Sequence, residues 1–233
     1  MDKEFDKIFS RLCRTRNAHR VWQDFVTLSA LEFSQIADFR QDRKDSYMRI
    51  IEDYSEEERD DIARLLTRTA MALEENPEQD FLGQLYMEYR FGNIRLGQHF
   101  TPYNVSYMMA MMTLSAEEIE QKGWMAVNDP TCGSGVLLIA AANCLKAQGT
   151  NYHDRVLFIG QDLDSCIAMM CYIQISLLGC AGYVIVGNSL TEPQTGDVLF
   201  APQGNTWITP MYFKKTWHWR RALQLVQSAF IKE

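Results

Sequence analysis

Residues 128–135 read Asn-Asp-Pro-Thr-Cys-Gly-Ser-Gly, and this stretch decides the fold class. Apolar runs at 124–127 and 136–140 flank it, which predicts a buried strand, a tight loop and then a helix. Gly133 and Gly135 allow the loop backbone to approach a ligand where a Cβ atom would block it. A strand, a glycine-rich turn and a helix in this order are typical of doubly wound α/β folds that bind nucleotide-like ligands. Taken alone, the stretch also fits an ordinary strand-to-helix turn.

The loop differs from the two common phosphate-binding loops. Leu138 stands where the dinucleotide loop Gly-x-Gly-x-x-Gly has its third glycine, and no Gly-Lys-Ser/Thr follows as in a P-loop. The acidic Asp129 at the head of the loop disfavours a pyrophosphate. The sequence therefore favours a cationic or amine-bearing ligand.

Strands and helices alternate after residue 114, whereas the first ninety-odd residues have helical spacing of their apolar side chains. The predicted strands are 124–128, 156–161, 183–187 and 197–201. The predicted helices are 18–39, 55–73, 78–90, 103–113, 134–148 and 164–179. We therefore predict a helical region over residues 1–95 and an α/β domain over residues 96–233.

Local signals fix several helix ends. Ser55 and Glu58 form a capping-box pattern, and Asn76-Pro77 is predicted to end that helix and cap the next. Thr101 is the expected N-cap of helix 103–113, with Pro102 at its first position. The four methionines of this helix favour adaptable core packing over a partner groove. Gly179 is expected just beyond the end of helix 164–179.

Four motifs in order resemble N6-adenine DNA methyltransferases, most closely the modification subunits of type I restriction–modification systems. Asp-Pro-Thr-Cys-Gly-Ser-Gly resembles their S-adenosylmethionine (AdoMet) loop, and Gly-Gln-His-Phe-Thr-Pro at 97–102 resembles their Phe-Thr-Pro motif. Residues 160–164 resemble the acidic end of the second strand, and residues 187–190 the loop after the third. The resemblance covers roughly residues 80–200.

The resemblance implies a Rossmann-like, AdoMet-dependent methyltransferase domain with AdoMet as its cofactor. In it, the Asp162 carboxylate accepts hydrogen bonds from the ribose hydroxyls, as in dinucleotide folds. Asn188 stands where the family commonly has Asp, and its amide oxygen can accept from the adenine amine. Asp164 is the expected N-cap of the following helix. The implied AdoMet contacts are Phe100, Thr101, Asp129, Thr131, Gly133, Gly135, Asp162, Leu163, Asn188 and Leu190.

The catalytic motif of that family is not intact. Its Asn-Pro-Pro-aromatic sequence, which orients and stacks an extruded adenine, corresponds to Ala-Pro-Gln-Gly at 201–204. Pro202 and Gln203 are the candidate catalytic residues that remain, and Trp207 or Tyr212 is a candidate stacking residue. Two hypotheses stay open: an enzyme that methylates adenine N6, and a non-catalytic AdoMet-binding module that regulates a restriction–modification or mobile-element system. A small-molecule methyltransferase is a third.

Composition and charge predict the class of protein and its cellular compartment. With 233 residues, 47% of them hydrophobic, the chain can bury a real core, and no run is long enough for a membrane span. The charged N-terminus and six cysteines without a Cys-x-x-Cys pair predict a cytoplasmic protein with reduced thiols and no metal site.

We expect that this chain needs a partner protein to bind DNA. The net charge of −7 argues against strong DNA binding by the chain alone. About 30 residues follow Pro202, which leads us to expect that a partner specificity protein supplies DNA recognition. The basic, Trp-containing segment 214–221 fits either a nucleic-acid contact or, as we favour, an amphipathic helix. Homo- and hetero-oligomers both remain open.

Overall fold

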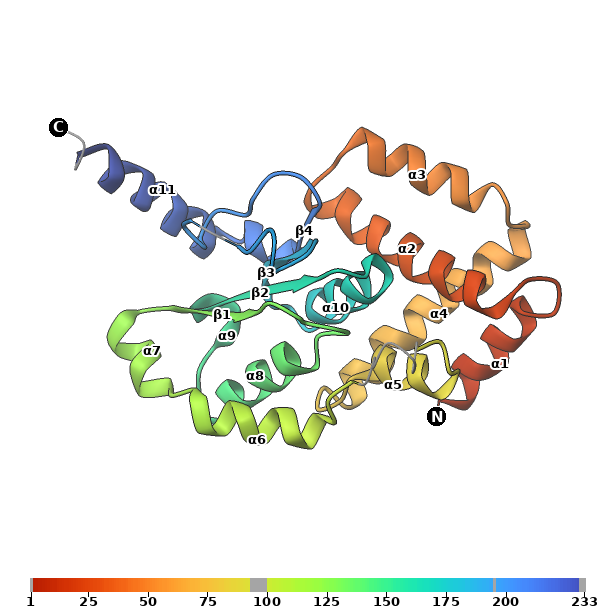
Figure 1. Cartoon of the computed structure of the whole chain (residues 1–233), viewed down its shortest axis with the longest axis horizontal. Helices are drawn as coiled ribbons and strands as arrows, with labels where there is room; N and C mark the ends of the chain where they lie inside the picture. Colours follow the sequence, from red (N-terminus) through yellow and green to blue (C-terminus); the bar gives the residue numbers. More distant parts are fainter. Residues whose placement is uncertain (1, 93–99, 195, 231–233) are drawn as a thin grey trace.

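Three parallel strands and one antiparallel strand form a sheet with the order β1-β2-β3-β4 (Figure 1). The computed structural model describes residues 2–92, 100–194 and 196–230. Its strands are β1 (Met125–Asp129), β2 (Val156–Asp162), β3 (Ala181–Val186) and β4 (Thr206–Ile208). In register, Asp129 lies opposite Gly160 and Asp162 opposite Val186, so the parallel strands end at one edge of the sheet.

Helices connect the parallel strands. The chain passes from β1 to β2 through α8 (Val136–Ala147) and the short α9 (Tyr152–Arg155), and from β2 to β3 through α10 (Ser165–Leu177). The carboxylate of Asp164 caps α10, because its Oδ1 accepts from the backbone N–H groups of Cys166 and Ile167 at 2.9 and 3.2 Å. Gly179, at φ +69°, follows the end of the same helix as predicted. The α/β alternation from residue 124 to residue 186 is thus confirmed.

The two faces of the sheet are covered differently. Val156 and Phe158 belong to the apolar cluster that includes α8 and α10, whereas Leu157 and Ile159 pack on the opposite face against Tyr183 and the C-terminal segment. This alternation follows from the two-residue period of a strand. In the described parts of the chain the crossover helices therefore share one face, and the doubly wound detail of the predicted fold is not confirmed.

The N-terminal region is helical, as predicted. It contains α1 (Lys3–Leu12), α2 (Ala18–Ala37), α3 (Gln41–Ile51), α4 (Glu56–Glu75) and α5 (Phe81–Glu88). The capping box of Ser55 and Glu58 is formed at the start of α4. Asn76 ends α4, but the prediction that Asn76-Pro77 caps the next helix was wrong. The cap of α5 is Asp80, whose carboxylate accepts from the Gly83 N–H at 2.9 Å.

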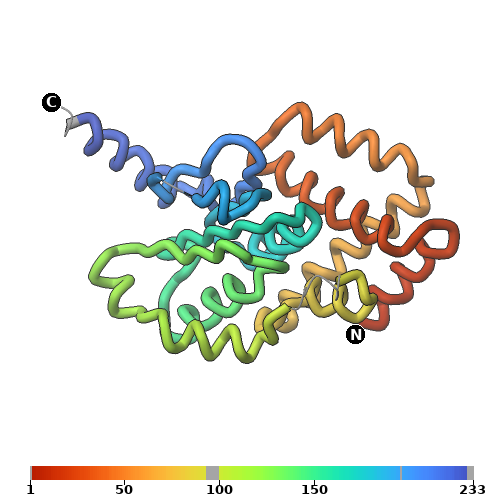
Figure 2. Tube along the Cα trace, viewed as in Figure 1, coloured from red at the N-terminus to blue at the C-terminus, as the bar shows by residue number. Residues whose placement is uncertain are grey.

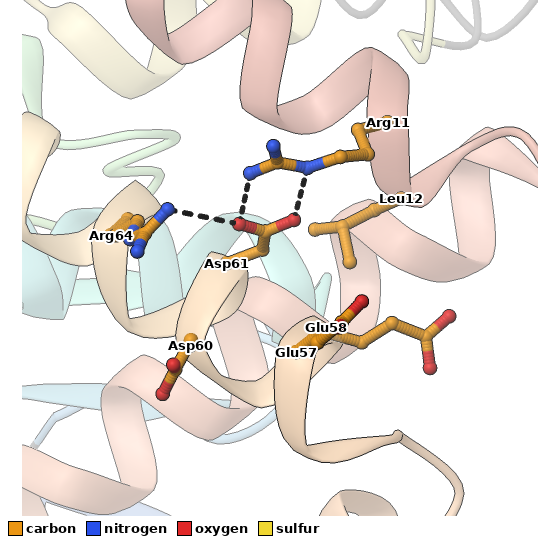
Figure 3. A pocket seen from close by; sticks show the side chains of 7 residues that line it. All are labelled: Arg11, Leu12, Glu57, Glu58, Asp60, Asp61 and Arg64. Atoms are coloured by element: carbon orange, nitrogen blue, oxygen red, sulfur yellow. Dashed lines mark hydrogen bonds and ion pairs between the residues drawn. The ribbon is translucent and has the colours of Figure 1, made fainter.

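One apolar core joins the helical region to the sheet. Trp22 and Phe25 of α2 belong to the same cluster as Tyr172 and Ile173 of α10, and α2 packs against α10. At the periphery, Arg11 of α1 donates from Nε to Asp61 Oδ2 of α4 at 2.5 Å, beside a cavity of about 280 Å³ (Figure 3).

The predicted boundary between residues 95 and 96 lies outside the described residues and remains a prediction.

The predicted strand at 197–201 was wrong. This segment forms turns, in which Asp197 Oδ1 accepts from the Leu199 N–H at 3.0 Å. A side-chain acceptor of this kind competes with a strand ladder for backbone donors. Leu199 is nevertheless buried on the second face of the sheet, so its apolar neighbourhood reflects burial rather than a strand. The fourth strand is formed later in the chain and runs antiparallel to β3.

Helix α6 (Tyr103–Thr113) differs from its prediction in two ways. Its N-cap is Pro102, at ψ 142° and without a side-chain cap, so neither Thr101 as cap nor Pro102 as first helical residue is correct. The buried side of α6 is made by the small residues Ser106 and Ala110, because α6 approaches α8 closely there. Its methionines are exposed instead of forming core, namely Met108, Met109, Met111 and Met112.

The other helices in the described parts of the chain are α7 (Ala116–Lys122), the 3-10 helix η2 (Pro210–Phe213) and α11 (Lys215–Phe230). Helix α11 confirms the favoured interpretation of the basic segment in part. Trp217 is fully buried, with the Arg220 guanidinium 4.5 Å from its ring centre, whereas Trp219 is exposed. The far end of α11, in dark blue, projects away from the rest of the chain (Figure 2). Among the helices that the structure describes, none combines the length and hydropathy that a membrane-spanning segment requires.

Candidate functional site

A cavity of about 380 Å³ lies where β1 and β2 end. It is bounded by the glycine-rich loop, by the end of β2 and by the residues that precede α6. Six of the predicted AdoMet contacts line it, namely Phe100, Thr101, Asp129, Thr131, Gly133 and Asp162. The structure therefore brings together residues from three of the four motifs recognised in the sequence. Gly97, Gln98 and His99 of the Phe-Thr-Pro motif lie outside the described residues.

Asp129 lines this cavity and carries a buried carboxylate. The residue lies at the end of β1 and is only 7% exposed. Oδ1 accepts from the Thr131 N–H at 3.1 Å, whereas Oδ2 has no hydrogen-bond partner among the described residues. Burial raises the pKa of Asp129, and the nearby charge of Asp162 raises it further. A cationic group in the cavity would relieve both effects.

Asp162 connects the end of β2 to the glycine-rich loop. Its Oδ2 accepts from the Gly133 N–H at 2.9 Å, and its Oδ1 accepts from the Asp164 N–H at 3.0 Å. An ionised carboxylate has about four acceptor sites, so both oxygens can still accept from ligand hydroxyls. Asp162 thus shapes the loop and retains the capacity to bind a ligand.

The two glycines of the loop have different roles. Gly133, at φ +54°, lies at the cavity beside Phe100, whose ring would be 3.4 Å from an added Cβ atom. Gly135, at φ +100°, does not line the cavity, and its Cβ atom would lie 2.8 Å from Cys171 Sγ of α10. Gly135 therefore allows the start of α8 to pack against α10.

The other predicted ligand contacts lie outside the cavity lining. Leu163 and Leu190 are exposed, at 70% and 91%. Asn188 uses its amide oxygen in a local turn, since Oδ1 accepts from the Leu190 N–H at 2.9 Å. The loop that carries Asn188 and Leu190 follows β3.

The candidate catalytic residues lie at a different cavity. Pro202 and Gln203 line a space of about 390 Å³ together with residues of β4 and of the segment between α2 and α3. Arg40 from that segment donates to the Gly204 carbonyl at 3.0 Å. This cavity and the one at Asp129 have no lining residue in common.

Three residues that support the glycine-rich loop were not singled out in the sequence. Ser134 donates from its hydroxyl to the Asp80 carboxylate, and Gln174 donates to both Asp80 and the Ser134 carbonyl. Asp80 before the apolar pair Phe-Leu at 81–82 is an N-cap pattern that the sequence does show. Its contacts to Ser134 and Gln174 span 54 and 94 residues, and no local spacing reveals them.

Comparison with protein-family models matches residues 78–225 to the family described as N-6 DNA Methylase. Searches of curated proteins and of solved structures found no match. The matched segment covers more than half of the chain and contains every residue that lines the cavity at Asp129. The resemblance to N6-adenine DNA methyltransferases inferred from the four sequence motifs is thereby confirmed, whereas the closer likeness to type I modification subunits stays a prediction. The chain belongs to the N-6 DNA methylase family.

Proposed function

We propose that the chain binds AdoMet in the cavity at Asp129. The observation that carries this proposal is the buried Oδ2 of Asp129, which has no partner among the described residues. A buried carboxylate is costly unless a cation or hydrogen-bond donor pairs with it. AdoMet has an ammonium group and a sulfonium group, and members of this family are AdoMet-dependent methyltransferases.

The residues around the cavity fit this ligand. The free oxygen of Asp129 suits the ammonium group, and the Asp162 carboxylate suits the two ribose hydroxyls. Gly133, which has no side chain, and the half-buried Phe100 also line the cavity. When bound, AdoMet supplies an electrophilic methyl group, and the chain contributes binding and orientation.

Charge provides a direct test of this assignment. Calorimetric titration at neutral pH should give saturable binding of AdoMet, weaker binding of S-adenosylhomocysteine, which lacks the sulfonium charge, and none of ATP. Two carboxylates at one cavity favour cations over anions. Tighter binding of ATP than of AdoMet would contradict the proposal.

We propose further that this chain alone does not methylate DNA. Ala201 and Gly204 offer neither the side-chain oxygen nor the aromatic face that the motif provides, and Pro202 and Gln203 line the other cavity. In this view the protein is an AdoMet-binding module of a restriction–modification or mobile-element system. Its net charge of −7 supports contact with DNA through a partner specificity protein.

Transfer of tritiated methyl groups to genomic DNA separates the two functions. The isolated chain should give background counts, and a partner that supplies the acceptor site should raise them. Robust transfer by the chain alone would instead favour an independent adenine methyltransferase.

A further inference from the structure

A buried polar cluster fastens α5 to the glycine-rich loop. Its members are Asp80 at the N-cap of α5, Ser134 in the loop and Gln174 in α10, and all three side chains are almost completely buried. Asp80 Oδ2 accepts from the Ser134 hydroxyl, while its Oδ1 accepts from Gln174 Nε2 at 2.8 Å and from the Gly83 N–H at 2.9 Å. Both carboxylate oxygens are therefore held by donors.

Gln174 closes the cluster. Its Nε2 also donates to the Ser134 carbonyl at 2.9 Å, and its Oε1 accepts from the Leu82 N–H at 3.1 Å. Ser134 is thus held through its hydroxyl and its carbonyl at once. Two elements distant in the sequence, α5 and α10, set the position of this one loop residue.

Close backbone approach makes the cluster possible. A Cβ atom on Gly83 would lie 2.0 Å from Asp80 Oδ2 and 2.4 Å from Ser134 Oγ. Only a residue without a side chain fits between these two groups. The first turn of α5 is therefore in direct contact with the loop.

Ser134 lies between the backbone bonds that shape the wall of the cavity. On one side of it, the Gly133 N–H reaches Asp162; on the other, the Gly135 N–H donates to the Cys132 carbonyl at 2.8 Å. We propose that Asp80 is a positioning residue, which acts through Ser134 to hold the loop in the shape that binds the ligand. This inference rests on the proposed AdoMet site.

A carboxylate suits this task better than a neutral group, because it offers acceptor oxygens on both sides. Hydrogen bonds to an ionised group are also stronger than those between neutral groups. The cost of burying Asp80 is visible in its pKa, which burial raises above the ordinary value and which the hydrogen bonds from Gln174, Ser134 and Gly83 lower only in part. Burial of the Asp80 carboxylate thus costs free energy, and the cluster holds this group at the place where it contacts the loop.

The test compares variants that separate the loop from the helix cap. Ser134→Ala removes the loop contact but leaves the bond from the Gly83 N–H to Asp80, whereas Asp80→Ala removes both. Asp80→Asn keeps an acceptor for Gly83 and Gln174 and can donate to the Ser134 hydroxyl. Ser55→Ala removes a helix cap far from the loop and serves as the matched control.

Two readouts are needed for each variant, namely AdoMet affinity by calorimetry and amide hydrogen exchange of residues 130–138 without ligand. We expect Asp80→Ala and Ser134→Ala each to weaken AdoMet binding about ten-fold and to speed exchange in the loop. The double variant should be no weaker than Asp80→Ala, because both changes break the same contact. Asp80→Asn should recover most of the affinity, and Ser55→Ala should bind like wild type.

The positioning role of Asp80 and the binding of AdoMet can be refuted separately. Wild-type binding together with unchanged affinity and unchanged loop exchange in Ser134→Ala would overturn the positioning role alone. Failure of the wild-type chain to bind AdoMet would contradict the proposed function itself, and the role of Asp80 in ligand binding with it.

Discussion

Gly133 donates its backbone N–H to the carboxylate of Asp162 across 2.9 Å, and this bond joins the loop after β1 to the end of β2. The two residues come from separate sequence motifs. Their contact means that the acidic residue expected to bind the ribose also shapes the loop expected to hold the rest of the ligand. A substitution at Asp162 is therefore expected to affect both the contact to the ribose and the shape of the loop.

A cycle between protein and ligand separates the two roles of Asp162. S-adenosylhomocysteine and its 3′-deoxy analogue would be titrated into the wild-type chain and into Asp162→Ala. Loss of the hydroxyl should weaken binding to wild type by about 1.5 kcal/mol or more, the value of a hydrogen bond to a charged group, and should have little effect in the variant. An equal loss in both proteins would show that Asp162 acts only on the loop.

Asp129 is predicted to lower the stability of the ligand-free protein. Because burial raises its pKa above the ordinary value of 3.8, the folded state binds this proton more tightly than the unfolded chain does. Stability is therefore lost as the pH rises through the raised pKa. Asp129→Asn should raise the free energy of unfolding at neutral pH by on the order of 1 kcal/mol.

Chemical denaturation at several pH values checks the direction of this change in the free energy of unfolding. The advantage of Asp129→Asn should shrink as the pH falls from the raised pKa of Asp129 to the ordinary pKa of an aspartate, and below that pH it should be lost, because Asp129 is then protonated in both states. Saturating AdoMet should reverse the order of the two proteins at neutral pH, since only the carboxylate pairs with the ammonium group. A variant less stable than wild type without ligand would refute this reasoning.

Gly135 offers a test of the packing between α8 and α10. Gly135 and Gly204 have nearly the same φ, +100° and +104°, but an added Cβ atom meets Cys171 only at Gly135 and nothing within 4 Å at Gly204. Each Ala variant carries roughly 1–3 kcal/mol of backbone strain. Gly135→Ala should lose about 1–3 kcal/mol more from overpacking, as measured by urea denaturation. Equal losses would show that backbone conformation alone requires Gly135.

Sequence reasoning predicted the structure correctly where the geometry is local. The loop at 128–135 was predictable because its glycines and its leading aspartate follow one another in the chain, and Asp162 because it ends the next strand. The strand at 197–201 was predicted wrongly because an apolar run reports burial, and Leu199 is buried within a turn. The exposed methionines of α6 were missed because the choice of face depended on the small residues that meet α8.

The support of the site was beyond the reach of sequence spacing. Asp80 contacts Ser134 and Gln174 only after α5, the loop and α10 have packed together. Asn188 illustrates the converse, since its motif was recognised but its amide oxygen is used in a local turn.

Methyl transfer to DNA is predicted to stay at background for the isolated chain, and repair of the motif should not change this. The triple variant Ala201→Asn, Gln203→Pro, Gly204→Tyr rebuilds the family sequence, but these residues line a cavity separate from the one at Asp129. Quantification of N6-methyladenine by mass spectrometry after incubation with genomic DNA would check both proteins. Abundant N6-methyladenine from the wild-type chain would contradict the prediction, and its loss in Gln203→Ala would then identify Gln203 as the catalytic group.

The central claim is that AdoMet occupies the cavity at Asp129, and hydrogen exchange of the wild-type chain with and without AdoMet tests it most directly. The account predicts slower exchange on AdoMet addition in peptides covering residues 129–137 and 160–167, which contain Asp129, Gly133 and Asp162. The segment 215–230, which forms α11 and contributes no residue to this cavity, should exchange as before. Saturable AdoMet binding without slower exchange in the first two segments, or with protection confined to other parts of the chain, would contradict it.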